Sequence, residues 1–227
     1  MCYSVESSIK TTALSLFAII YLFQSGNPYF KWLAVGLLGY CTMQFSECLL
    51  WMTEPQYECT EWNVIISLTL IPLAIVLQPL GTLFGSFFVT PWSESSPGRQ
   101  WFTIIFTAII IASVAYMQLY KPEKVCTVVT PKGHLFWGKT KEINHNSPPY
   151  VLSQIIWFIL VIAPLFMFWD KSLLLPVIIC ITPLLGFLYG HYNTDSRGSI
   201  WCFYTSFTSV VASVFLFLKT HKIFNAL

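Results

Sequence analysis

The fold class is decided by the stretch Lys31-Trp-Leu-Ala-Val-Gly-Leu-Leu-Gly-Tyr-Cys-Thr-Met-Gln-Phe-Ser-Glu-Cys-Leu-Leu-Trp-Met52. A bilayer core of about 30 Å takes roughly 20 apolar residues of helix, and this stretch is long enough. Between its ends it carries a single charge, Glu47. A charge at the centre of a membrane helix costs about 2.5 to 3.5 kcal/mol on insertion scales, so it usually faces a partner, a water-filled cavity or a site. We therefore expect a membrane-spanning helix with Glu47 as the centre of any site.

The composition of the whole chain agrees with this interpretation. The 227 residues are 56% hydrophobic and 10% charged, with a mean hydropathy of +0.66. So few charges cannot cover a soluble globule of this size, which predicts a polytopic membrane protein with the lipid bilayer as its partner. The formal net charge of +2 is too small to indicate nucleic-acid binding.

Apolar stretches and turn signals predict an all-α membrane protein with seven transmembrane helices in one domain, residues 1–227. We expect no cofactor, and the sequence leaves a homo-oligomer open. The predicted spans are residues 8–25, 31–52, 63–89, 100–120, 150–169, 172–190 and 199–219.

Seven spans place the two ends of the chain on opposite sides of the membrane. We call side A the side of the N-terminus and of the loops 53–62, 121–149 and 191–198. Side B has the loops 26–30, 90–99 and 170–171 and the C-terminal tail. Lys and Arg are slightly more frequent on side A, which by the positive-inside rule weakly favours a cytoplasmic side A.

Two cysteines argue for the opposite orientation. Cys59 and Cys126 lie in two different loops of side A and could form a disulfide, or could remain two reduced thiols. A disulfide requires an oxidising compartment, so we expect an extracellular or lumenal N-terminus and a cytoplasmic C-terminus. After Cys126, two short β-rich runs around Pro131-Lys-Gly133 predict a small β-hairpin in the loop 121–149.

The side chain of Glu47 is expected about 7 Å below the side-A boundary, because it precedes the end of its span by about five residues. Gln44, Glu47 and Trp51 follow i, i+3, i+7 spacing and share one helix face. Glu47 on such a face is either a proton or cation site, or a structural hydrogen-bonding group.

Other reactive residue types gather on the same side of the predicted membrane and could surround a vestibule floored by Glu47. Arg197 is the best candidate counter-ion for Glu47, and His191 the best neutral partner. Only two metal-ligand types fall close together here, His191 and Asp195, so we predict no metal site. The predicted vestibule residues are Cys2, Ser4, Trp51, Asp195, Ser199 and Trp201.

A path from Glu47 into the membrane would need further polar residues. Gln78 lies near the middle of the third span, and Ser206 and Ser209 belong to a serine stripe on one face of the last span. Such a stripe is either a wet path or a seam for helix packing.

The opening Met1-Cys-Tyr-Ser4, the later Gln44-x-x-Glu47-x-x-x-Trp51 and the start of the last span, Gly198-Ser-Ile-Trp-Cys-Phe203, resemble a family of small bacterial and giant-virus membrane proteins of uncharacterised function. The resemblance implies no activity. It implies that Cys2, Ser4, Gln44, Glu47, Trp51, Ser199 and Trp201 belong to one constellation.

These observations favour a membrane protein that conducts, transports or senses a proton or small cation at Glu47. Two alternatives stay open. One is a hydrolase acting on lipid at side A, with His191, Asp195 and Glu47 around a metal or with Cys2 as nucleophile. The other is a ligand-binding or assembly protein without turnover.

Overall fold

Each apolar stretch of the sequence forms an α-helix in the computed structural model, which describes residues 4–119, 125–139, 148–171, 173–193 and 197–221. The described residues contain the seven predicted helices, with ends within a few residues of the predicted ones. They are α1 (Val5–Gln24), α2 (Pro28–Met52), α3 (Glu61–Gly85), α4 (Pro97–Leu119), α5 (Pro148–Phe168), α6 (Leu174–Asn193) and α7 (Arg197–Thr220), with short 3-10 turns η1 (Ser86–Phe88) and η2 (Trp92–Glu94).

The first helices begin at residues whose side chains cap them. The Ser4 hydroxyl accepts the Ser7 N–H, and the Thr60 hydroxyl accepts the Asn63 N–H, each at 3.2 Å. Asn27 caps α2 in the same way, and Pro28 follows it at the first helical position. These caps satisfy backbone donors that a helix start otherwise leaves without partners.

Five helices in the described part of the chain are long and apolar enough to cross a membrane: α1, α2, α3 continued through η1, α4 and α7. The apolar stretches described in α5 and α6 are shorter, Ile155–Phe168 and Leu174–Gly186. Length and composition are thus compatible with a multi-pass membrane protein.

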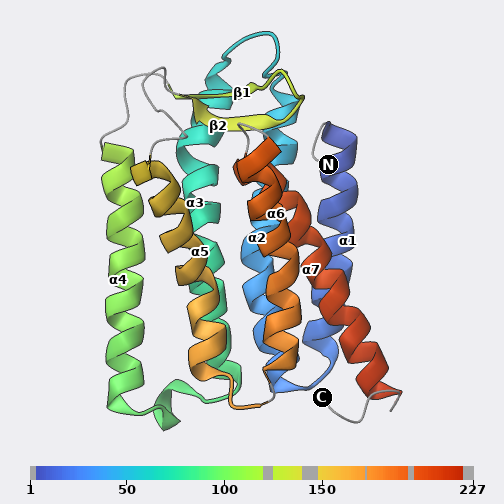
Figure 1. Cartoon of the computed structure of the whole chain (residues 1–227), viewed down its shortest axis with the longest axis vertical. Helices are drawn as coiled ribbons and strands as arrows, with labels where there is room; N and C mark the ends of the chain where they lie inside the picture. Colours follow the sequence, from blue (N-terminus) through green and yellow to red (C-terminus); the bar gives the residue numbers. More distant parts are fainter. Residues whose placement is uncertain (1–3, 120–124, 140–147, 172, 194–196, 222–227) are drawn as a thin grey trace.

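The helices run side by side, with the start of α1 and the end of α7 at opposite ends of the bundle (Figure 1). Helix α2 lies at the centre, where it contacts α1, α3 and α7, while α4 stands at one edge and contacts α3. The helix that carries Glu47 is therefore packed against other helices on several sides.

Helices α2 and α3 approach each other closely because glycines face the contact. A Cβ atom added to Gly39 would lie 2.5 Å from the carbonyl oxygen of Leu77, which no side chain tolerates. Nearer side B, the indole N–H of the fully buried Trp32 donates to the Thr82 carbonyl at 2.6 Å. The sequence of small residues along this contact sets the spacing of the two helices.

The predicted β-hairpin is present at the side-A end of the bundle (Figure 1). Strands β1 (Cys126–Val129) and β2 (Leu135–Lys139) pair antiparallel, with Val129 opposite Leu135. The turn between them needs Gly133, whose φ of 78° is costly for other residues. Its N–H donates to the Thr130 carbonyl at 2.8 Å and closes the turn.

Candidate functional site

Glu47 lies in the last turns of α2 and has no exposed surface. Among the Asp, Glu, Lys and Arg side chains that the structure describes, it is the one that is buried. Burial of an ionisable group is expensive, so its surroundings must supply polar contacts. Those contacts define the candidate site.

The polar contacts that Gln44 and Glu47 receive on this face of α2 come from two different elements. The indole N–H of Trp137, on β2, donates to the Glu47 carboxyl oxygen Oε1 at 3.1 Å. One helical turn deeper, the hydroxyl of Thr11, on α1, donates to the Gln44 amide oxygen at 3.2 Å. The shared helix face predicted for Gln44 and Glu47 thus carries polar contacts to a neighbouring helix and to the hairpin.

The hairpin is fixed to the start of α3 by a pair of hydrogen bonds between the Asn63 side chain and the Thr127 backbone. The side-chain amide of Asn63 donates to the Thr127 carbonyl and accepts the Thr127 N–H, both at 2.9 Å. One turn further along α3, the Ser67 hydroxyl lies 2.8 Å from the Thr127 hydroxyl. All three residues are buried, so water does not compete for these bonds.

A disulfide joins the same two elements. Cys59 and Cys126, predicted as a candidate pair, are bonded, with their Cα atoms 5.9 Å apart and 67 positions apart in the sequence. The bond lies next to Thr127 in β1 and just before α3. The hairpin is therefore held to α3 both covalently and by hydrogen bonds.

Apolar side chains seal the space around these polar contacts. Leu135 is buried against Met43 and Leu50 of α2 and Ile66 of α3, and the rings of Trp51 and Trp137 pack against the same cluster. The sequence predicts a vestibule floored by Glu47. Among the described residues, the hairpin instead lies over Glu47 and covers it.

Two buried hydroxyls near this end of the bundle have no hydrogen-bond partner among the described residues, those of Ser8 and Ser199. Ser8 lies one turn closer to side A than Thr11, and Glu47 lies one turn closer to side A than Gln44. Because α1 and α2 are antiparallel and joined at Thr11 and Gln44, Ser8 lies near the level of Glu47. Buried hydroxyls without a protein partner usually bind ordered water.

The structure places the other predicted site residues as follows. Ser4 caps α1, as described above. Trp201 is 7% exposed, and its ring packs against Tyr40 and Phe158. Cys2 and Asp195 lie outside the described residues, and of His191 and Arg197 only the backbone, at the end of α6 and the start of α7, is described.

The residues predicted to continue a polar path from Glu47 into the membrane lie at different helix–helix contacts. Gln78 is buried between α3 and α2 at the level of Gly39, roughly 12 Å along α2 from Glu47 at 1.5 Å per residue. Ser206 and Ser209 face α1, where the Ser15 hydroxyl donates to the Ser206 carbonyl at 3.4 Å. The Ser209 hydroxyl also donates to that carbonyl, so the stripe forms a packing seam in this structure.

Sequence reasoning did not identify Thr11, which binds Gln44 from α1. It also missed the residues that hold the hairpin, namely Asn63, Ser67, Thr127 and Trp137. Asn63 and Ser67 did carry a signal, because they are polar residues at i, i+4 spacing at the start of an otherwise apolar span. Trp137 carried none, since its partner is ninety positions away in the chain.

His134 is also buried at this end, with 3% of its surface exposed. It precedes β2 at the tip of the hairpin. Burial, and then the positive charge of Lys132, lower the pKa of His134 below its ordinary value of 6.5. The hairpin therefore favours the neutral imidazole.

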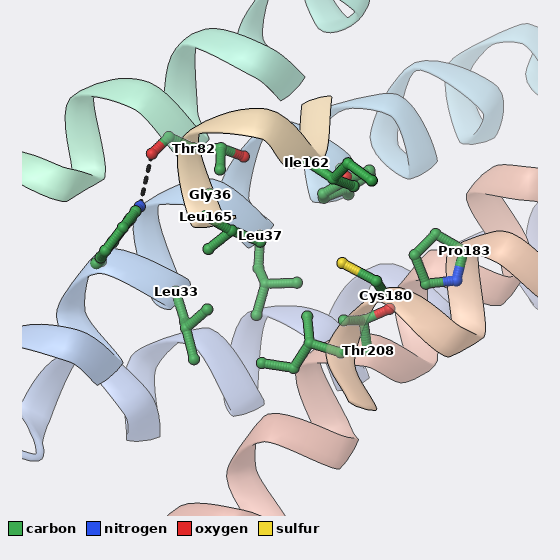
Figure 2. Close-up of a pocket in the computed structure, with 12 residues that line it drawn as sticks. Leu33, Gly36, Leu37, Thr82, Ile162, Leu165, Cys180, Pro183 and Thr208 are labelled. Carbon is green, nitrogen blue, oxygen red and sulfur yellow. Dashed lines mark hydrogen bonds between the residues drawn. The ribbon is translucent and has the colours of Figure 1, made fainter. Parts of the chain in front are cut away.

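A cavity of about 30 Å³ lies deeper in the bundle and is lined from five helices (Figure 2). Its lining includes Gly36 of α2, which precedes Glu47 by eleven positions, or roughly 16 Å of helix. Figure 2 also shows the hydrogen bond that Thr82 accepts from Trp32 beside this cavity. Within the described residues, no group of three His, Cys, Asp or Glu side chains could hold a metal ion.

Comparison with protein-family models, with curated proteins and with solved structures finds no significant match for the chain. The resemblance of its first fifty residues to a viral and bacterial family thus stays a prediction.

Proposed function

We propose that the chain is a seven-helix integral membrane protein in which a proton or small cation binds at Glu47 beneath the hairpin. The apolar length of the helices supports membrane insertion. The Cys59–Cys126 disulfide supports an oxidising, extracellular or lumenal side A. The C-terminus then lies in the cytoplasm.

The observation that carries the functional part is the complete burial of Glu47 under Trp137. A carboxyl group with no exposed surface is accommodated either as the neutral, protonated acid or as a carboxylate whose charge is balanced by a cation. The indole N–H orients the carboxyl group, and the buried Ser8 hydroxyl adds a polar group near the same level of the bundle. Displacement of the hairpin would admit water from side A to this group.

The hairpin serves as a lid in this proposal. It is tethered at Cys126 and Thr127, on β1, whereas the contact with Glu47 is made from β2. The strand that covers Glu47 is held by its pairing with β1 and by apolar contacts of Leu135. Its displacement would break these contacts while β1 remains anchored to α3. Proton or cation entry would be coupled to this local movement.

The test is proton flux in proteoliposomes that carry a pH-sensitive dye and an imposed potassium diffusion potential. Wild-type protein should acidify or alkalinise the vesicles faster than empty liposomes do. Glu47→Gln should reduce the rate to that of empty liposomes. The control is Glu61→Gln, because Glu61 is an exposed acid at the same end of the bundle and should leave the rate unchanged.

Circular dichroism of each variant checks that it is folded. A folded Glu47→Gln variant with wild-type flux of protons, and of sodium or potassium in a parallel assay, would remove Glu47 from the mechanism.

An assembly or ligand-binding role without transport is the second candidate, because the hairpin packs directly over Glu47. In that case Glu47→Gln lowers stability, and wild-type vesicles show no flux above the empty ones. The same experiment therefore separates the two functions.

A further inference from the structure

A second, larger cavity lies at the opposite end of the bundle, on side B. It has a volume of about 260 Å³ and is formed where α2 and α6 begin, α5 ends and α7 ends (Figure 1). Its lining residues are Asn27, Tyr29, Phe30, Trp169, Lys171, Leu175 and Lys219.

Two lysines from separate parts of the chain meet at this cavity. Lys171 follows α5, and Lys219 belongs to the last turn of α7. Both side chains are exposed, and the Lys219 ammonium lies 6.0 Å from the centre of the Phe30 ring. Two ammonium groups at one cavity favour an anionic ligand.

The acid next to these lysines is already engaged. Asp170 accepts a hydrogen bond from the hydroxyl of Tyr29, another residue of the lining. This bond fixes the turn between α5 and α6 to the start of α2. Asp170 does not itself belong to the lining, whose charged groups are Lys171 and Lys219.

The inner wall of the cavity is apolar and buried. Phe30, Trp169 and Leu175 are 2%, 8% and 5% exposed. The Trp169 ring packs edge to face on Tyr29, with ring centres 4.9 Å apart, and lies 5.4 Å from the ring of Trp32. Aromatic rings of this kind are enriched where a membrane protein meets the headgroup region of the bilayer.

We propose that this cavity binds the phosphate group of an anionic phospholipid, with Lys171 and Lys219 holding the phosphate and the aromatic wall contacting the glycerol and the first methylenes. The proposal rests on the membrane placement given above, but not on transport at Glu47. On side B it fits a cytoplasmic leaflet, where anionic lipids gather and basic residues contribute to binding.

The experiment uses full-length protein in neutral detergent, titrated with short-chain phosphatidylglycerol and followed by native mass spectrometry. Parallel titrations use phosphatidylcholine, glycerol phosphate and inorganic phosphate. We expect a lipid adduct with phosphatidylglycerol that the zwitterionic lipid and the two soluble phosphates do not compete away. Each lysine near a membrane surface contributes about fivefold in affinity, so Lys171→Gln with Lys219→Gln should weaken binding roughly 25-fold.

Lys31→Gln is the matched control, because Lys31 is also a lysine at side B, placed over the Phe23 ring and outside the cavity. It should leave phosphatidylglycerol binding unchanged. Since the two cavity lysines are exposed, their replacement should leave the thermal unfolding temperature in lipid-free detergent unchanged. Lys219→Arg should keep most of the affinity.

Three results would overturn the proposal: unchanged binding in the double variant, an equal loss with Lys31→Gln, or equal occupancy by inorganic phosphate. The first shows that the two lysines do not hold the lipid, the second shows attraction to general surface charge, and the third shows a site for free phosphate. None of these outcomes depends on proton flux, so this proposal and the proposed function fail separately.

Discussion

At the scale of single residues, Glu47 shows how one buried carboxyl group is accommodated. Its oxygen Oε1 accepts a hydrogen bond from the Trp137 indole N–H. The same face of α2 carries Gln44, which accepts a hydrogen bond from Thr11 of α1. A buried acceptor that loses its donor pays the desolvation cost of the group, about 1 to 3 kcal/mol. Loss of the bond to Trp137 should therefore lower the free energy of unfolding.

Trp137→Phe removes the indole N–H and keeps an aromatic ring in the cluster. We expect the free energy of unfolding to fall by about 1 to 3 kcal/mol, measured by chemical unfolding in detergent micelles. The control is Trp62→Phe, since Trp62 is 69% exposed and should contribute little. Equal stability of the two variants would show that the bond to Glu47 contributes nothing to the fold.

His134 makes the hairpin sensitive to pH. Because burial lowers its pKa in the folded chain, the unfolded chain binds the proton first as the pH falls below about 6.5. The stability of the folded state should therefore decrease in this range, with a slope of at most about 1.4 kcal/mol per pH unit for one proton.

The measurement is the unfolding free energy of wild type and His134→Gln between pH 7.5 and 5. The decrease should be smaller in the variant. His221→Gln, which alters an exposed histidine at the other end of the bundle, should follow the wild-type curve. A His134→Gln curve with the wild-type slope would show that another group carries the pH dependence.

At the scale of elements, the packing of α2 on α3 and the docking of the hairpin on α3 have different chemical origins. Helices α2 and α3 meet through glycines and the Trp32 hydrogen bond. The hairpin meets α3 through the Asn63 amide and the disulfide. Close backbone approach dominates within the bundle, whereas specific polar and covalent bonds hold the element that covers its end.

Gly39→Ala tests the helix contact. The added methyl group would lie 2.5 Å from the Leu77 carbonyl oxygen, so the two backbones must separate. Overpacking of this kind costs about 1 to 3 kcal/mol, which thermal unfolding in micelles should detect. Gly98→Ala is the control, because a Cβ at Gly98 meets no atom within 4 Å. A Gly39→Ala protein as stable as Gly98→Ala would mean that the helices separate at no cost.

At the scale of the whole molecule, the seven helices place side A and side B at opposite ends, with different chemistry. The Cys59–Cys126 bond and Glu47 belong to side A. The cavity with Lys171 and Lys219 belongs to side B. An oxidising outer compartment would suit side A, and an anionic inner leaflet would suit side B.

This arrangement predicts the orientation of the chain in a bacterial inner membrane. Green fluorescent protein fused to the C-terminal end should fluoresce, and alkaline phosphatase fused at the same point should be inactive, because that end is expected in the cytoplasm. Blocking of free thiols before reduction should then leave Cys59 and Cys126 to be labelled only after reduction. Active alkaline phosphatase together with a non-fluorescent green fluorescent protein fusion would show the opposite orientation.

The sequence by itself determined the seven helices, their approximate ends and the hairpin. Apolar length and turn residues are local signals, and Gly133 and the caps at Ser4 and Thr60 act within a few positions. It also indicated Cys59 with Cys126 as a candidate pair, and Gln44 with Glu47 on one face, because helix periodicity and loop position are readable without contacts.

Only the tertiary structure decided what those residues touch. The cover over Glu47 comes from Trp137, ninety positions along the chain, and Ser206 and Ser209 face α1. Hydrogen-bond partners distant in sequence depend on how helices and hairpin dock, and docking follows from the summed packing of many side chains rather than from any local pattern. For that reason the sequence could place Glu47 at the side-A end of a helix, while the fold alone decided that a hairpin covers it.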